Sequence, residues 1–163
     1  MGKGVPVSEP RQPVRADSDE QAPLIVGDFY AGAYGPTIIL ILSSPGAGAW
    51  FQETLRELAK GGPARTLTSE PRVFVAHIDG IEMTTRATGP CVSLKRRDGE
   101  SDKSFVWSAT REGWLYLADL TAPLCAGGVG HHYLTDDKDD DGLIELSSGE
   151  HDPQKIAKLT NES

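Results

Sequence analysis

The chain has 163 residues, 38% of them hydrophobic, which is enough for one ordinary core, so a single domain is expected. Its net charge of −8 repels phosphate backbones, and direct nucleic-acid binding is therefore not expected. The longest apolar run, residues 37–42, is far too short to cross a bilayer, so we expect a cytoplasmic protein without a membrane partner. Cys91 and Cys125 have no partner at metal or redox spacing, and both are expected to be reduced and half-buried.

The chain begins with a predicted tail followed by two predicted strands. Residues 1–22 combine prolines with charged and small residues, a composition that favours a disordered tail. Residues 24–26 and 37–42 are β-branched runs, which are typical of strands. The second run lacks alternation, which indicates a strand buried on both faces.

Two helices are predicted from their start signals and apolar stripes. The first begins at Ser43-Ser44-Pro45, where a hydroxyl N-cap precedes proline at the first helical position, and it ends at Gly61-Gly62-Pro63. The second begins near Thr110 and ends at Gly127-Gly128, and Pro123 is expected to kink or shorten its last turn. The stripes expected to be buried against a sheet contain Phe51, Leu55, Trp114 and Leu117.

An antiparallel meander is predicted between the helices. Asp79-Gly80, Gly89-Pro90 and Asp98-Gly99 are the turn signals between its short strands. Those strands are residues 72–77, 81–88, 92–97 and 104–107, and a final strand covers residues 143–147. The order strand, helix, strands, helix, strand predicts an α+β domain over residues 23–150, with a mainly antiparallel sheet and two helices packed on one face. Residues 151–163 form a C-terminal extension, in which residues 153–159 are a candidate short helix.

An Asp-rich segment, residues 136–141, supports two interpretations. Counted from Asp137, it matches the start of a calcium loop, whose metal ligands would be Asp137, Asp139, Asp141 and Glu145. Position 12 of that loop is Ser148, where a bidentate Glu is needed, and residues 126–134 lack a helical pattern. The other interpretation is an Asp-rich turn between two strands, which would attract calcium only weakly.

Other candidates for chemistry have simpler structural explanations. His131 and His132 are adjacent, so on a strand they point to opposite faces and cannot chelate one ion together; one is expected to pack on the Tyr133 ring. The turn from Gly46 to Gly48 lacks the lysine of a phosphate-binding loop and is interpreted as a helix start. No catalytic set is recognisable, so neither an enzyme nor a cofactor is expected. Core packing is expected for the tryptophans, Trp50, Trp107 and Trp114.

Acidic residues are concentrated near the C-terminus. Residues 129–163 contain nine acidic residues against three lysines. This charge favours a basic protein partner and accelerates the encounter with it. The residues expected to contact the partner are Asp136, Asp139, Asp140 and Asp141.

Several short motifs together carry a family resemblance. They are the strand ending in Leu42-Ser43-Ser44, the helix segment Thr54-Leu55-Arg56-Glu57-Leu58-Ala59, Val106-Trp107-Ser108 followed by Thr110-Arg111-Glu112-Gly113-Trp114, and Gly130-His131-His132-Tyr133-Leu134 leading to Leu143-Ile144-Glu145-Leu146-Ser147. Over about residues 24–150 the chain thereby resembles small bacterial immunity proteins of polymorphic toxin systems. The resemblance implies a non-enzymatic protein that binds and neutralises a cognate toxin. The Asp-rich insert after Thr135 and the Gly-x-Gly before the first helix depart from the family pattern.

Overall fold

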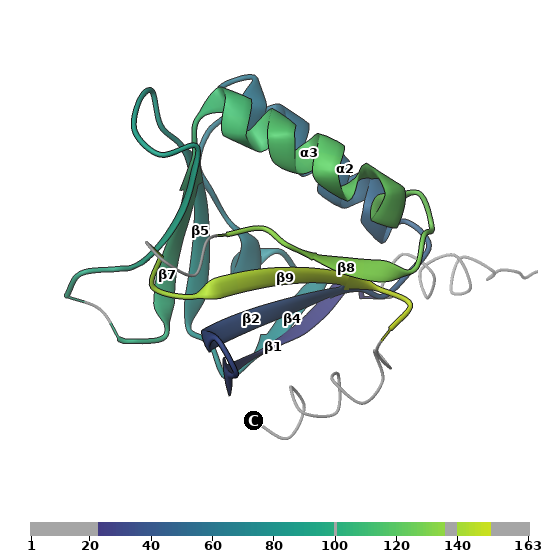
Figure 1. The fold of residues 1–163 in the computed structure, drawn as a ribbon, viewed down its shortest axis with the longest axis horizontal. Helices are drawn as coiled ribbons and strands as arrows, with labels where there is room; N and C mark the ends of the chain where they lie inside the picture. The colour runs from purple at the N-terminus through teal and green to yellow at the C-terminus, as the bar shows by residue number, and fades with distance from the viewer. Residues whose placement is uncertain (1–22, 100, 136–139, 151–163) are drawn as a thin grey trace, which may run out of the picture.

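The computed structural model describes residues 23–99, 101–135 and 140–150, which fold as two helices and two mixed sheets around a common core (Figure 1). The five-stranded sheet has the strand order β4-β1-β2-β9-β8, and the four-stranded sheet has the order β3-β5-β7-β6. In Figure 1 the helix pair and the two sheets lie on three sides of the core. The α+β class predicted from the sequence is therefore confirmed.

The five-stranded sheet brings strands from both ends of the described chain together. Its strands are β1 (Ile25–Gly32), β2 (Gly35–Leu42), β4 (Val73–Ala76), β8 (Gly130–Tyr133) and β9 (Leu143–Ser148). β1 is antiparallel to β2 and parallel to β4, while β9 is parallel to β2 and antiparallel to β8. Ile38 of β2 lies opposite Ile144 of β9. Consecutive β2 residues are buried on both faces, as the unbroken apolar run predicts, because Leu40 joins the main core and Ile41 joins a second buried cluster.

The four-stranded sheet corrects the predicted meander. Its strands are β3 (Arg65–Thr66), β5 (Gly80–Thr85), β6 (Val92–Arg96) and β7 (Ser104–Ala109). β5 and β7 are parallel, with Ile81 opposite Phe105, and β6 lies outside them as an antiparallel edge strand. β4 leaves the group and pairs with β1 in the other sheet.

The predicted single, mainly antiparallel sheet is therefore wrong. Asp98-Gly99 does mark the β6–β7 hairpin, but Asp79-Gly80 lies where the chain crosses from one sheet to the other. The predicted order is wrong as well, because two strands precede the first helix and two follow the second.

The helices, α2 (Ala47–Ala59) and α3 (Arg111–Cys125), pack against each other. The hydroxyl cap predicted for α2 is wrong, since Gly46 is the N-cap residue and the Ser43 hydroxyl donates to the carbonyl of Pro23 (3.0 Å). The cap predicted for α3 is confirmed, because the Thr110 hydroxyl accepts from the N–H of Gly113 (3.1 Å). α3 continues through Pro123 to Cys125.

Aromatic rings from three elements form the centre of the core. Trp107 of β7 packs edge-on against Trp114 of α3, with ring centroids 5.3 Å apart, and it stacks on Phe51 of α2 at 6.5 Å. All three side chains are fully buried, as are Leu55 and Leu117, so the predicted stripes of both helices are confirmed. Core packing is confirmed for Trp107 and Trp114, whereas Trp50 is only partly buried.

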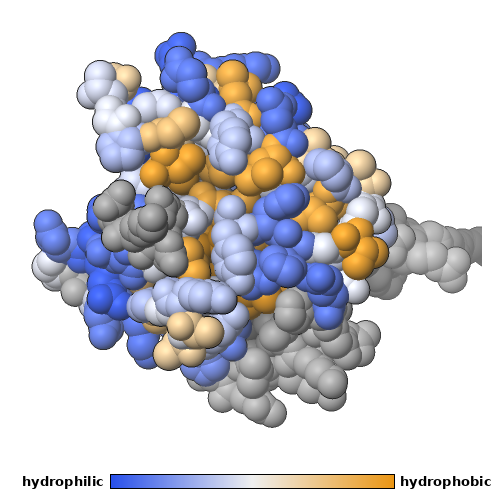
Figure 2. Space-filling view, in the orientation of Figure 1, coloured by the Kyte–Doolittle hydropathy of each residue, from blue (hydrophilic) through white to orange (hydrophobic). Residues whose placement is uncertain are grey.

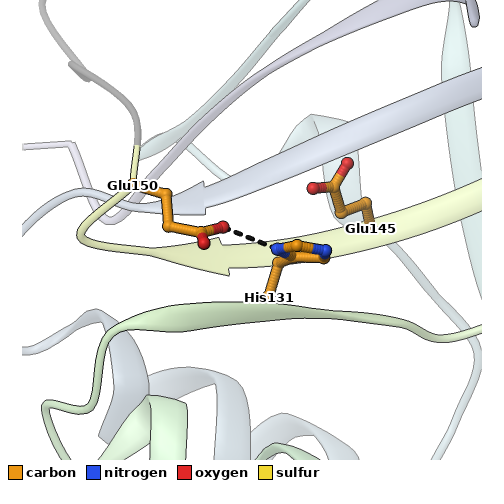
Figure 3. A group of neighbouring side chains, drawn as sticks. All are labelled: His131, Glu145 and Glu150. Atoms are coloured by element: carbon orange, nitrogen blue, oxygen red, sulfur yellow. Dashed lines mark hydrogen bonds and ion pairs between the residues drawn. The ribbon is translucent and has the colours of Figure 1, made fainter.

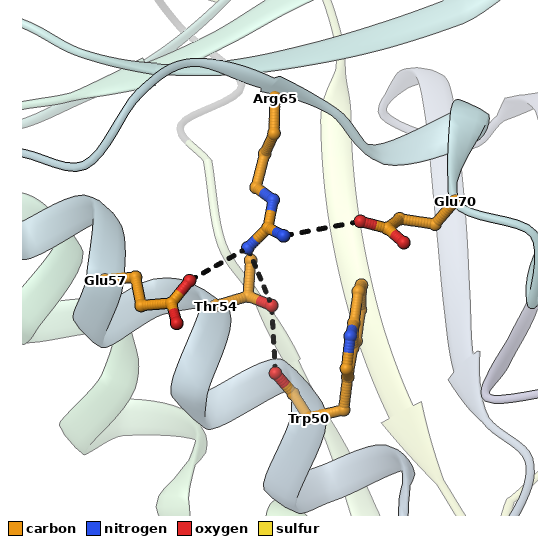
Figure 4. Close-up of polar contacts among 5 residues, drawn as sticks. All are labelled: Trp50, Thr54, Glu57, Arg65 and Glu70. Atoms are coloured by element: carbon orange, nitrogen blue, oxygen red, sulfur yellow. Dashed lines mark hydrogen bonds and ion pairs between the residues drawn. The ribbon is translucent and has the colours of Figure 1, made fainter.

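Arg65 joins α2 to the segment before β4 (Figure 4). Its guanidinium lies 3.3 Å from the carboxylates of both Glu57 on α2 and Glu70 beyond the short 3-10 helix Leu67–Ser69. It also donates to the Thr54 hydroxyl (3.4 Å), which itself donates to the Trp50 carbonyl (2.9 Å).

No helix within the described residues is long and apolar enough to span a membrane.

Candidate functional site

A groove of about 790 Å³ opens between α3, β8 and the start of β6. Its walls are the side chains of Tyr34, Cys91, Val92, Tyr116, Leu117, Tyr133, Leu134, Thr135 and Leu143. Figure 2 shows hydrophobic side chains exposed on this face between the helices and the strands beneath them, with hydrophilic residues around them. The groove is therefore an apolar recess in a strongly acidic protein.

Three tyrosines from separate elements line this groove. Tyr34 lies in the β1–β2 turn and is 71% exposed, Tyr116 lies on α3 and is 57% exposed, and Tyr133 ends β8 and is 46% exposed. Desolvation and the negative charge of Glu145 raise the pKa of the Tyr133 phenol. The sequence does not indicate that these tyrosines share a site, because single tyrosines scattered along a chain have no recognisable spacing.

Asp140 and Asp141, the described residues of the Asp-rich segment, lie at the edge of the four-stranded sheet. Asp140 Oδ1 accepts from the N–H of Leu94 (3.0 Å), and Asp141 Oδ2 accepts from the N–H of Arg96 (2.7 Å). The N–H of Asp141 in turn donates to the carbonyl of Leu94 (2.9 Å). These two residues thus pair with backbone groups of β6 that an edge strand would otherwise leave free.

The proposed calcium ligands occupy different surroundings. Asp137 and Asp139, like the proposed partner contact Asp136, lie outside the described residues. Asp141 is bonded to β6, whereas Glu145 lies within β9 and is 7% exposed. The strands before and after the segment, β8 and β9, are antiparallel, as the hairpin interpretation predicts, in place of the two helices of a calcium loop.

His131 and His132 point to opposite faces of β8, as predicted. His131 pairs across the strands with Ser147, and its ring packs edge-on against Tyr133 at 5.8 Å, while His132 pairs with Leu146. The Nδ1 atom of His131 lies 2.6 Å from a carboxylate oxygen of Glu150. Figure 3 shows this contact, with Glu145 beside it on β9. Ligand atoms of His131, Glu145 and Glu150 all lie within 4.8 Å of one another.

Three other predictions concern glycines and cysteines. Gly48 is required by close packing, because a Cβ there would lie 2.1 Å from the carbonyl oxygen of Cys125, and α2 begins within the turn, as the helix-start interpretation predicts. Both cysteines are free, as predicted. Cys91 is exposed in the groove and not half-buried, whereas Cys125 is partly buried.

Comparison of the chain with family models, curated proteins and solved structures finds no match in any of the three.

Proposed function

We propose that this chain is a non-enzymatic, immunity-like protein that binds and neutralises a basic protein toxin through the tyrosine-lined groove. The observation that carries the proposal is the position of Tyr34, Tyr116 and Tyr133 around one apolar recess in a chain with a net charge of −8. An apolar centre beside a charged border is the usual anatomy of a protein interface.

Tyrosine suits such a recess for physical reasons. Its ring buries a large apolar area at a small cost in side-chain entropy, and its hydroxyl can still form a hydrogen bond. The face of the ring also attracts lysine and arginine side chains, which a basic partner supplies. We therefore expect the tyrosines to provide most of the binding energy, as interface hot spots do.

Charge has a separate role in the proposed complex. The net charge of −8 and the aspartates of residues 136–141 attract a basic partner over a distance of about one Debye length, ~8–10 Å at moderate salt. Such steering mainly raises the association rate. Asp140 and Asp141 also bond to β6, so any contact that these two residues make with the partner must be separated from their structural role.

The decisive experiment is coexpression with the candidate toxin that the neighbouring gene encodes. The wild-type chain should prevent killing, and Tyr116→Ala should abolish protection and weaken binding by about 2 kcal/mol or more. Tyr30→Ala is a matched control, because Tyr30 is 42% exposed but does not line the groove. If the toxin kills equally well with and without the wild-type chain, the proposal fails. If Tyr30→Ala and Tyr116→Ala weaken binding equally, the groove is not the interface.

A kinetic experiment separates steering from contact. Replacing Asp136, Asp137 and Asp139 with Asn should slow association and flatten its dependence on salt, with a smaller effect on dissociation. Replacing Glu53, Glu112 and Asp119 with Gln or Asn removes the same number of charges from the two helices as a control. The steering role is contradicted if the two variants associate equally fast and the aspartate variant differs from the control only in its dissociation rate.

A further inference from the structure

We propose that His131, Glu145 and Glu150 form a binding site for a divalent transition-metal ion, with zinc as the best-fitting candidate. The geometry on which this rests is the approach of one imidazole and two carboxylates to within 4.8 Å of one another. The site does not depend on the toxin-binding proposal, because none of its three residues lines the groove.

The burial of Glu145 is the observation that points to a ligand. This carboxylate belongs to a residue that is 7% exposed, yet within the described part of the chain no hydrogen bond or ion pair compensates its charge. An uncompensated buried charge is costly, and a cation is the usual compensation when no basic side chain is present. Figure 3 shows the Glu145 carboxylate on the same side of β9 as the His131–Glu150 pair.

A second buried polar group lies on the same face of the sheet. Ser147 follows Glu145 by two residues on β9 and therefore faces the same side, and it pairs in register with His131. Its buried hydroxyl has no hydrogen-bond partner among the residues that the structure describes. A water molecule that completes a metal shell would supply such a partner.

The backbone holds the three ligands in place. Register between β8 and β9 sets His131 opposite Ser147 and Tyr133 opposite Glu145, so the histidine and the first glutamate come from adjacent strands. Gly149 then adopts a left-handed conformation (φ 77°), which glycine tolerates without strain, and the following residue, Glu150, lies against His131. The Tyr133 ring packs against the imidazole and limits its rotation.

The donor set selects the class of ion. Imidazole nitrogen favours zinc and its neighbours in the first transition series, whereas calcium and magnesium prefer shells made of oxygen alone. Tetrahedral zinc, with bonds of about 2.0–2.2 Å, places its ligand atoms ~3.4 Å apart, so small side-chain movements from the present spacing suffice. Three protein ligands leave a fourth position for water. In this arrangement the ion takes the place of the proton in the hydrogen bond between His131 and Glu150.

The test measures binding of Zn²⁺ alone to the full-length chain, freed of metal, by calorimetry and by equilibrium dialysis. We expect one ion per chain, and at least an approximately tenfold loss of affinity in Glu145→Gln and in His131→Ala. Co²⁺ should give the visible absorption of a tetrahedral or five-coordinate site in the wild type and lose it in these variants. Circular dichroism shows whether Glu145→Gln, a substitution at a buried position, still folds. If it does not, the loss of zinc affinity is measured in Glu150→Gln, whose side chain is more exposed.

Three controls locate the ion. His132→Ala changes the histidine on the opposite face of β8, Asp141→Asn changes the Asp-rich segment, and His151→Ala changes the next histidine along the chain, and all three should bind zinc as the wild type does. The proposal is overturned if the wild type does not bind zinc. It is also overturned if Glu145→Gln and Glu150→Gln bind with unchanged affinity, or if Asp141→Asn or His151→Ala loses binding while these two retain it.

Discussion

Asp141 accepts a hydrogen bond of 2.7 Å from the backbone N–H of Arg96, which lies 45 residues earlier in the chain. The bond joins the Asp-rich segment to the outer edge of the four-stranded sheet, and the bond from Leu94 to Asp140 repeats it two residues along the strand. Asp140 and Asp141, which belong to the segment that the sequence indicates as a calcium loop or a steering patch, therefore also cover a strand edge. Their structural and functional effects must be separated experimentally.

The first prediction concerns this edge. Asp141→Ala should lower the free energy of unfolding by about 1–2 kcal/mol, because a charge-assisted hydrogen bond to β6 is lost. Asp119→Ala removes an exposed carboxylate from α3 and should change stability by less than ~0.5 kcal/mol. Urea unfolding of both variants provides the measurement. Equal stability of the two would show that the Asp141 bond contributes little.

The second prediction concerns the helix faces. Leu55→Ala and Leu117→Ala should each cost about 2–5 kcal/mol, since both side chains are buried in the core. Leu115→Ala is the matched control, because Leu115 is an exposed leucine of the same helix as Leu117. Thermal unfolding of the three variants tests the difference. A Leu117→Ala variant that melts with the wild type would contradict the packing of α3.

The third prediction concerns the contact between the helices. Gly48→Ala should destabilise the protein by about 1–3 kcal/mol, because the added methyl group would overlap the carbonyl of Cys125. Gly46→Ala is the control, since a Cβ there meets only the side chain of Leu24, at 4.0 Å. Chemical unfolding should rank the wild type and Gly46→Ala together, above Gly48→Ala. The reverse ranking would mean that the helices do not approach each other at Gly48.

The fourth prediction concerns the two thiols. Burial raises the pKa of Cys125, and the hydrogen bonds with Gln52 and Thr121 offset this only in part. Because the thiolate is the reactive form, Cys125 should be alkylated more slowly than the exposed Cys91, and its rate should keep rising at pH values above the usual thiol pKa. Mass spectrometry of Cys91→Ser and Cys125→Ser after timed alkylation measures each rate. In urea the two thiols should be alkylated at similar rates. Similar alkylation rates of Cys91 and Cys125 in the folded protein as well would argue against the burial of Cys125.

The fifth prediction concerns calcium. Asp141 is engaged with β6, Glu145 lies with His131 and Glu150, and Ser148 stands where a calcium loop needs Glu, so Ca²⁺ should bind only weakly. Calorimetry should give a dissociation constant in the millimolar range. Micromolar binding that Asp137→Ala abolishes would support the calcium-binding alternative instead.

Local features of the fold could be predicted from the sequence. Phe51 and Leu55 predict a helix face by their spacing, and the Thr110 cap fixes the start of α3. Strand pairing could not be predicted in the same way, because it depends on contacts between distant residues. The pairing of β4 with β1, for example, follows from the register of Val73 with Ile25, which no local pattern encodes.

The same difference between local and long-range features applies to the candidate sites. The sequence indicates the Asp-rich segment and His131, because runs of one residue type and adjacent histidines are visible in a linear chain. Glu150 was missed as the partner of His131, from which 19 residues separate it. The groove was missed for a similar reason, since Tyr34 and Tyr116 meet only after the helices and sheets have packed.

The parallel pairing of β2 with β9 has a consequence for synthesis of the chain on the ribosome. Ile38 is synthesised 106 residues before its partner Ile144, so the edge of β2 that faces away from β1 has no strand beside it until β9 has been made. Such long-range pairing slows folding and exposes apolar strands to aggregation in the meantime. A nascent chain stalled before Leu143 should therefore resemble an unfolded protein to proteases, and chaperones should bind it through the apolar run of β2.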